Sequence, residues 1–248
     1  IRLRPGINTC MIRNQNQVNG QNGPVDLKGE CDSNIEIEGG IWTTLATSQE
    51  ESNGNINGGP DSANELHGHG VILMNRVKQV IVRNVTIKES RPHGVQFCNA
   101  SEFMAENILF IDHRRDGVHI NGPASYGIIR NIRGVTGDDM IALNAWDWKN
   151  TVMSFGPIHH MLVENVKAGV EGSDFRAEIR FLGGTKHYPD GKTLDCDIDN
   201  CVVRDISGIK TFKMYDQPNL ELGRDNDFAD PIGNFKNLYF NKIVIDHF

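Results

Sequence analysis

The stretch that decides the fold is HRRDGVHINGPASYGIIRNIRGVTGDDMIALNAWDW, residues 113–148. Two short apolar segments in it follow acidic residues, DGVHI at 116–120 and DDMIAL at 138–143. Between them lies GIIRNIRGV at 127–135, where a central asparagine interrupts an apolar alternation. Because the two acidic starts are 22 residues apart, the stretch indicates a structural repeat of about that length.

Both kinds of segment recur along the chain. The asparagine-containing kind appears as VIVRNVTI at 80–87, FMAENILFI at 103–111, GIIRNIRGV at 127–135 and MLVENVKAG at 161–169, with weaker copies NCVVRDISG at 200–208 and LYFNKIVID at 238–246. Its asparagines, Asn84, Asn107, Asn131 and Asn165, are separated by 23, 24 and 34 residues. The second kind runs in phase, as HGVQF at 93–97, DGVHI at 116–120, DDMIAL at 138–143 and AEIRFL at 177–182.

This period predicts an all-β fold, a right-handed parallel β-helix with coils of about 22–24 residues. One coil cannot bury its apolar side chains alone, whereas stacked coils share a continuous core. We expect two short strands per coil, and an amide ladder formed by the asparagines at one corner. Glycines that follow turn residues, Gly94 and Gly117, fit positions that need a positive φ. A β-sandwich is the weaker alternative, because few hairpin turns lie between the strands.

We expect one domain that spans residues 1–248, with loop insertions at 47–64, 148–157 and 185–193. Both ends read like interior strands, so we expect flanking residues outside this chain. The net charge of -7 argues against non-specific nucleic-acid binding. No apolar run reaches 18 residues, so we expect no transmembrane helix.

The five cysteines fit small buried hydrophobic residues best. Cys196 and Cys201 lie close enough in sequence that a disulfide between them is an alternative. Their CDIDNC spacing is not typical of a metal site. We expect the protein to use no metal and no cofactor.

The repeat places Asp116 one coil before Asp138 and Asp139. These acids should therefore lie on adjacent strands, about 4.8 Å apart. Crowded carboxylates separate their pKa values, so that one is protonated while another is ionised. Glycoside hydrolysis needs this combination of an acid and a base or nucleophile. The alternative is a row of solvated or turn-capping aspartates.

NIEIEGGIW at 34–42, RRDGVHI at 114–120 and TGDDMIAL at 136–143 together resemble the polygalacturonase and rhamnogalacturonase family of pectin-degrading glycosidases. The resemblance runs over roughly residues 34 to 182. It implies a parallel β-helix, hydrolysis of a pectin-like polysaccharide with inversion and without a metal, and a secreted or periplasmic location. The family signature is Asn-Thr-Asp-Gly, Asp-Asp, Gly-His-Gly and Arg-Ile-Lys.

Carried over to this sequence, the resemblance implies Asp138 as the general acid, with Asp116 and Asp139 as bases. Arg180 takes the place of the signature arginine, and its guanidinium suits a uronate carboxylate. The sequence departs from the signature in several places: Arg114 and Arg115 replace Asn-Thr, Leu182 replaces the lysine, and only His159 and His160 offer a histidine between the acids and Arg180. The candidate substrate-binding residues are therefore Arg180, His159, His160, Arg115, Trp146, Trp148 and His119.

Two other functions remain open from the sequence. A polysaccharide lyase on the same fold would use the carboxylates to hold Ca²⁺ against a uronate. A non-catalytic carbohydrate-binding β-helix would explain the missing histidine and lysine. The sequence predicts neither the sugar nor the oligomeric state.

Overall fold

The computed structural model describes residues 1–2, 10–14, 31–44, 70–90, 92–146, 154–169, 177–214 and 234–245. All regular structure in these residues is β, as the sequence predicted. The strands are β1 (Ile12–Arg13), β2 (Asp32–Glu38), β3 (Ile41–Thr43), β4 (Ile72–Arg83), β5 (Thr86–Lys88), β6 (Val95–His113), β7 (Val118–Thr136), β8 (Asp139–Asn144), β9 (Ile158–Ala168), β10 (Glu178–Leu182), β11 (Gly184–His187), β12 (Thr193–Cys196), β13 (Ile198–Ile209), β14 (Thr211–Lys213) and β15 (Phe235–Ile245).

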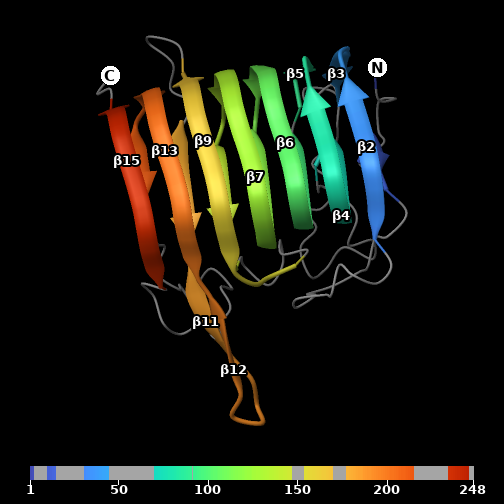
Figure 1. The fold of residues 1–248 in the computed structure, drawn as a ribbon. Helices are drawn as coiled ribbons and strands as arrows, with labels where there is room; N and C mark the ends of the chain where they lie inside the picture. The colour runs from blue at the N-terminus through green and yellow to red at the C-terminus, as the bar shows by residue number, and fades with distance from the viewer. Residues whose placement is uncertain are drawn as a thin grey trace.

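Thirteen of the strands form one large sheet, in which every pair between neighbouring strands is parallel. In Figure 1 the long strands β2, β4, β6, β7, β9, β13 and β15 lie side by side in chain order. The antiparallel hairpin β11–β12 projects away from them. This hairpin contains most of the insertion predicted at 185–193.

The predicted repeat is confirmed residue by residue in the strand register. Val80 pairs with Phe103, Phe103 with Gly127, and Gly127 with Met161. These four residues are the first residues of the four clear copies of the asparagine-containing segment. The weaker copies continue the series, because Val202 pairs with Leu162 on one side and with Tyr239 on the other.

The strand segments fall into three rows, not the two that the sequence suggested. The first row, which carries the acidic segments, runs through residues 12–13, 72–75, 95–98, 118–121, 141–144, 179–182 and 211–213. The second row runs through 77–83, 100–106, 124–130, 158–164, 198–204 and 235–241. The third row is short, with 86–88, 108–110, 132–134 and 166–168. Its residues form the second half of each asparagine-containing segment. Because one sequence segment supplies both the second and the third row, the sequence suggested a single strand there.

Side chains alternate between the core and the opposite face of the first row. Val118 and Ile120 lie in the hydrophobic core, so His119 and Asn121 must point to the other face of the strand. His119 and Asn121 are nevertheless buried. At β7 the first row therefore has an apolar inner face and a buried polar outer face.

The asparagine ladder is confirmed. Asn84, Asn107, Asn131 and Asn165 have φ values of 58°, 54°, 57° and 50°, a left-handed conformation that asparagine tolerates better than most residues. The side-chain amide of Asn107 donates to Asn84 Oδ1 at 2.6 Å, and that of Asn165 donates to Asn131 Oδ1 at 2.7 Å. Each of these bonds joins two neighbouring repeats at the turn between the second and third rows.

The prediction of a positive φ at Gly94 and Gly117 is wrong, because neither residue is among those with a positive φ. Close packing requires these glycines. A Cβ on Gly117 would lie 2.7 Å from the carbonyl oxygen of Met140 and 2.9 Å from a ring carbon of Phe110. Gly94 meets the same phenylalanine ring from the preceding coil.

The five cysteines are free thiols, and all except Cys31 are buried. This agrees with their prediction as small hydrophobic residues and leaves Cys196 and Cys201 unbridged. The predicted insertion at 47–64 lies outside the described residues, as does the part of 148–157 before residue 154. Among the residues that the structure does describe, no helix has the length and hydrophobicity needed to cross a membrane.

Candidate active site

Four ionisable side chains occupy equivalent places in successive repeats, at or just before the starts of the first-row strands. The amide of Gly94 donates to the carbonyl of Asp116, and the amide of Gly117 donates to that of Asp139, both at 2.8 Å. Glu178 pairs in turn with Asp139. The ionisable ladder therefore consists of His93, Asp116, Asp139 and Glu178, all of them buried. The predicted adjacency of Asp116 and Asp139 is part of it.

The three predicted catalytic aspartates come together at this ladder. Asp116, Asp138 and Asp139 each contribute one carboxylate oxygen to a group in which all the oxygens lie within 4.8 Å of one another. Asp138 sits in the turn before β8, and its side chain is 25% exposed. The side chains of Asp116 and Asp139 are only 6% and 1% exposed. Asp138 is therefore the most exposed of the three carboxyl groups.

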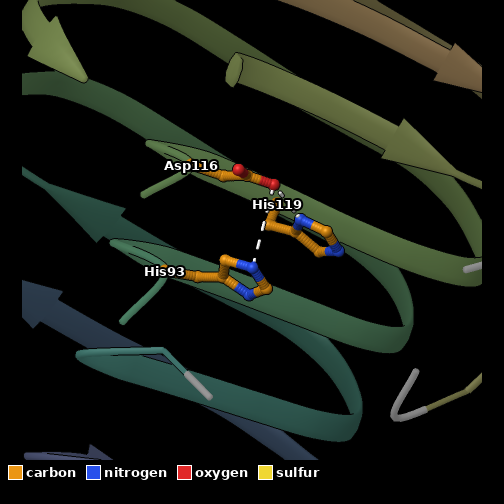
Figure 2. A group of neighbouring side chains, drawn as sticks. All are labelled: His93, Asp116 and His119. Carbon is orange, nitrogen blue, oxygen red and sulfur yellow. Dashed lines mark hydrogen bonds and ion pairs between the residues drawn. The ribbon is translucent and has the colours of Figure 1, made fainter. Parts of the chain in front are cut away.

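Two histidines hold the Asp116 carboxylate (Figure 2). His119 Nδ1 donates a hydrogen bond to Asp116 Oδ2 at 2.6 Å, and His93 Nε2 lies 3.8 Å from the same oxygen. The two imidazole rings are stacked, with centroids 4.1 Å apart and planes 6° from parallel. His119 was among the predicted site residues. His93 was missed, although the HG at 93–94 precedes the DG at 116–117 by one repeat and was visible as part of the HGVQF copy.

A third histidine fixes the backbone at Asp116. His113 Nε2 lies 2.8 Å from the carbonyl oxygen of Asp116. A carbonyl oxygen can only accept, so Nε2 carries the proton. Burial lowers the pKa of His113 to about 4, and the ring is neutral at neutral pH.

The environment separates the pKa values of the aspartates, as the sequence predicted for a crowded group. Burial alone would raise the pKa of Asp116, but attraction to His93 and the hydrogen bond from His119 outweigh it, and the pKa lies well below its usual range. Burial, and then the negative charge of Asp116, raise the pKa of both Asp138 and Asp139. The increase is larger for the more buried Asp139. Asp116 is thus the member of the group that ionises most readily, whereas Asp138 and Asp139 hold their protons more tightly than an ordinary aspartate does.

Three cations surround the acids, and each is paired with one of them. Arg115 lies 3.7 Å from Asp138, and Arg180 Nε lies 3.1 Å from Asp139 Oδ2. The sequence did not single out the third pair, in which Lys213 Nζ lies 2.7 Å from Glu178 Oε2. Lys213 follows Arg180 on the next strand of the first row. Arg114, the other arginine before Asp116, instead pairs with Asp112 at the surface.

The remaining predicted substrate-binding residues do not join this group. Trp146 is 1% exposed, and its indole N–H donates to the carbonyl of Gly183 at 2.8 Å. It packs in the core and offers no ring face to a sugar. Trp148 lies outside the described residues.

The two candidate histidines of β9 lie on the second row, away from the acids on the first. His159 pairs with Asp199 at 2.9 Å, and His160 stacks on Tyr126. His160 has a φ of 55°, so it occupies a left-handed corner of its coil. Neither histidine replaces the signature histidine beside Asp139.

The donor atoms of His93, Asp116 and His119 lie close enough together for a metal ion, but the ring geometry is unfavourable. A metal bonds to an imidazole nitrogen in the plane of the ring, at about 2.0–2.1 Å. An ion cannot lie in the planes of both rings while these are parallel and stacked. The three aspartates offer oxygen ligands suited to Ca²⁺, but Arg115 and Arg180 already neutralise two of them. The residues present fit a metal poorly.

Comparison of the chain with protein-family models, with curated proteins and with solved structures gives no match.

Proposed function

We propose that the chain is a glycoside hydrolase of the polygalacturonase-like type that cleaves a polysaccharide on a right-handed parallel β-helix. The observation that carries the proposal is the group of three aspartates on adjacent strands, one ionised and the others with raised pKa values. Glycoside hydrolysis needs one protonated and one ionised carboxyl group beside the scissile bond. The alternative, a row of solvated aspartates without a catalytic role, does not explain why the side chains of Asp116 and Asp139 are almost completely buried.

Two features support the β-helix. Successive first-row strands pair in parallel with a period of 23 residues from Val95 to Val118 to Ile141, so the chain returns to the same place once in each coil. Parallel strands joined by a crossover in one sheet are almost always connected in the right-handed sense.

In the proposed reaction Asp138 gives its proton to the glycosidic oxygen as the bond from that oxygen to the anomeric carbon breaks. Its raised pKa and its exposure suit this role. Asp116 is ionised and takes the proton of the attacking water. Because its pKa is raised, Asp139 is ionised in a smaller fraction of molecules than Asp116, and only the ionised form can accept a proton. We therefore propose that Asp139 shares a proton with Asp138.

The stereochemical outcome is open to measurement. The family resemblance implies inversion, for which carboxyl groups typically lie about 6.5–9.5 Å apart. The oxygens in this site lie within 4.8 Å of one another, nearer the separation of about 5–5.5 Å in retaining enzymes. Proton NMR of the first-formed anomer distinguishes the two, and an inverted product supports the resemblance.

The experiment that tests the function is a polysaccharide panel with two readouts, reducing ends and near-ultraviolet absorbance, each with EDTA and with calcium. A hydrolase releases reducing ends that persist in EDTA and produces no unsaturated sugar. A lyase produces an absorbing unsaturated product that disappears with EDTA. Binding without release of either product indicates a carbohydrate-binding module. Secretion, which the resemblance implies, is tested by fractionating the source cells.

A further inference from the structure

The cations at the candidate active site are committed to protein acids. Arg115 pairs with Asp138, Arg180 with Asp139 and Lys213 with Glu178. Arg180 also lies 3.9 Å from Glu178, so its guanidinium has an acid on each side. Among the described residues of the site, every Lys and Arg side chain therefore already has a carboxylate partner.

A uronate in this site would meet no surplus of positive charge. Four acids, Asp116, Asp138, Asp139 and Glu178, face three cations, and Asp116 is held in its ionised form. A substrate carboxylate would have to break one of the existing ion pairs or remain uncompensated beside Asp116. Placing a like charge in a partly buried site is unfavourable at such short range. The site therefore discriminates against an anionic sugar ring.

The polar group beside His119 is instead a neutral amide. Gln96 pairs with His119 across the neighbouring strand of the first row. Its side-chain N–H donates to Asn121 Oδ1 at 2.8 Å, while its buried Oε1 has no hydrogen-bond partner. The Gln96 side chain is completely buried, so it does not contact a substrate, and as a neutral amide it adds no positive charge to which a uronate could bind.

We propose that this site takes an electrically neutral glycan rather than a uronate polymer. The inference rests on the proposed glycosidase function and names its substrate class. The sequence suggested a uronate substrate, because Arg180 could bind its carboxylate. In the structure the Arg180 guanidinium neutralises Asp139 and Glu178 instead.

Matched polymer pairs test the inference with the unmodified protein. A uronan such as polygalacturonate and its carboxyl-reduced form differ only in that each carboxylate has become a neutral hydroxymethyl group. We expect the neutral form of at least one pair, or another neutral glycan, to be cleaved at least tenfold faster than any uronan. Cleavage of a uronan as fast as its reduced form, or faster, overturns the inference. No release from any neutral or acidic polymer contradicts the proposed glycosidase function itself.

A pair of variants tests the electrostatic reason. Glu178→Gln removes the partner of Lys213 and should increase binding of an oligogalacturonate several-fold, as measured by calorimetry. Glu164→Gln is the control, because it frees Arg204, 2.6 Å from Glu164 on the second row, and should leave binding unchanged. Equal effects of the two variants overturn the explanation. The salt dependence provides a readout without mutation: cleavage of the neutral polymer should vary less than twofold between 50 and 200 mM salt, since screening has no substrate charge to act on.

Discussion

His119 Nδ1 lies 2.6 Å from Asp116 Oδ2, with both side chains buried at the start of β7. The Asp-Gly turn lets an aspartate just before the strand and a histidine on it face one another. This contact fixes the orientation of the Asp116 carboxylate and helps to keep it ionised despite its burial. The proposed base is therefore supported by a neighbour three residues along the chain.

Removing the histidine should destabilise the fold in a pH-dependent way. His119→Ala leaves a buried carboxylate without its main donor, which should lower the free energy of unfolding at pH 7 by about 3 kcal/mol. The folded pKa of Asp116 lies below its unfolded value, so its stabilising contribution is complete above about pH 4 and is lost as the pH falls toward the folded pKa. The decrease in the free energy of unfolding caused by the mutation should therefore become smaller below about pH 4. Urea unfolding of both proteins at pH 7, 5 and 3 measures it.

His159→Ala serves as the control for that experiment. The ion pair of His159 with Asp199 is partly exposed, so its removal should cost less than about 1 kcal/mol. A penalty for His119→Ala that does not change with pH would show that Asp116 does not depend on this contact.

Arg180 should matter for stability because it neutralises Asp139. Arg180→Met leaves Asp139 buried and uncompensated, which should cost about 3–5 kcal/mol. Arg180→Met combined with Asp139→Asn removes both charges and should recover most of that loss. Chemical denaturation of the two single variants and the double variant gives the coupling energy. Simple additivity of the two single effects would contradict a direct ion pair.

The asparagine ladder makes two separable contributions. Asn107→Ala should lose about 1 kcal/mol for the hydrogen bond to Asn84 and about 1–2 kcal/mol for placing alanine at a φ of 54°. Asn107→Gly removes the same hydrogen bond but adopts this backbone without steric strain, at some entropic cost. We therefore expect the glycine variant to be the more stable of the two in thermal unfolding. The reverse order would mean that the corner does not impose its backbone conformation.

Much of the site could be predicted because the repeat is regular where the acids occur. A period of 23 or 24 residues between Asn84 and Asp139 turns sequence distance into spatial adjacency, which places Asp139 beside Asp116 and Asn107 beside Asn84. The same period places His93 one repeat before Asp116. A single His-Gly pair does not suggest catalysis as Asp-Gly and Asp-Asp pairs do, so His93 was not predicted as a site residue.

The remainder of the site lies beyond insertions that break the period. Glu178 comes 39 residues after Asp139, and Lys213 comes 33 residues after Arg180, so counting coils could not pair them. The sequence also did not determine whether a side chain at a turn points into the core or away from it. Trp146 looked like a sugar-stacking residue, yet a hydrogen bond to Gly183 draws it inward. The need for glycine at Gly117 came from Phe110 in the previous coil, a contact that local turn rules do not contain.

The most direct test of the central claim is the rate of reducing-end release by Asp138→Asn beside the unmodified protein, on whichever polysaccharide the panel identifies. Asparagine keeps the size of the side chain but cannot donate the acid proton, so the rate should fall by at least about 100-fold with folding intact. Asp205→Asn is the matched control, because it changes an exposed partner of Lys242 at a left-handed corner that asparagine accepts, and it should retain full activity. Release by Asp138→Asn within a few-fold of the unmodified protein would contradict the assignment of Asp138 as the acid.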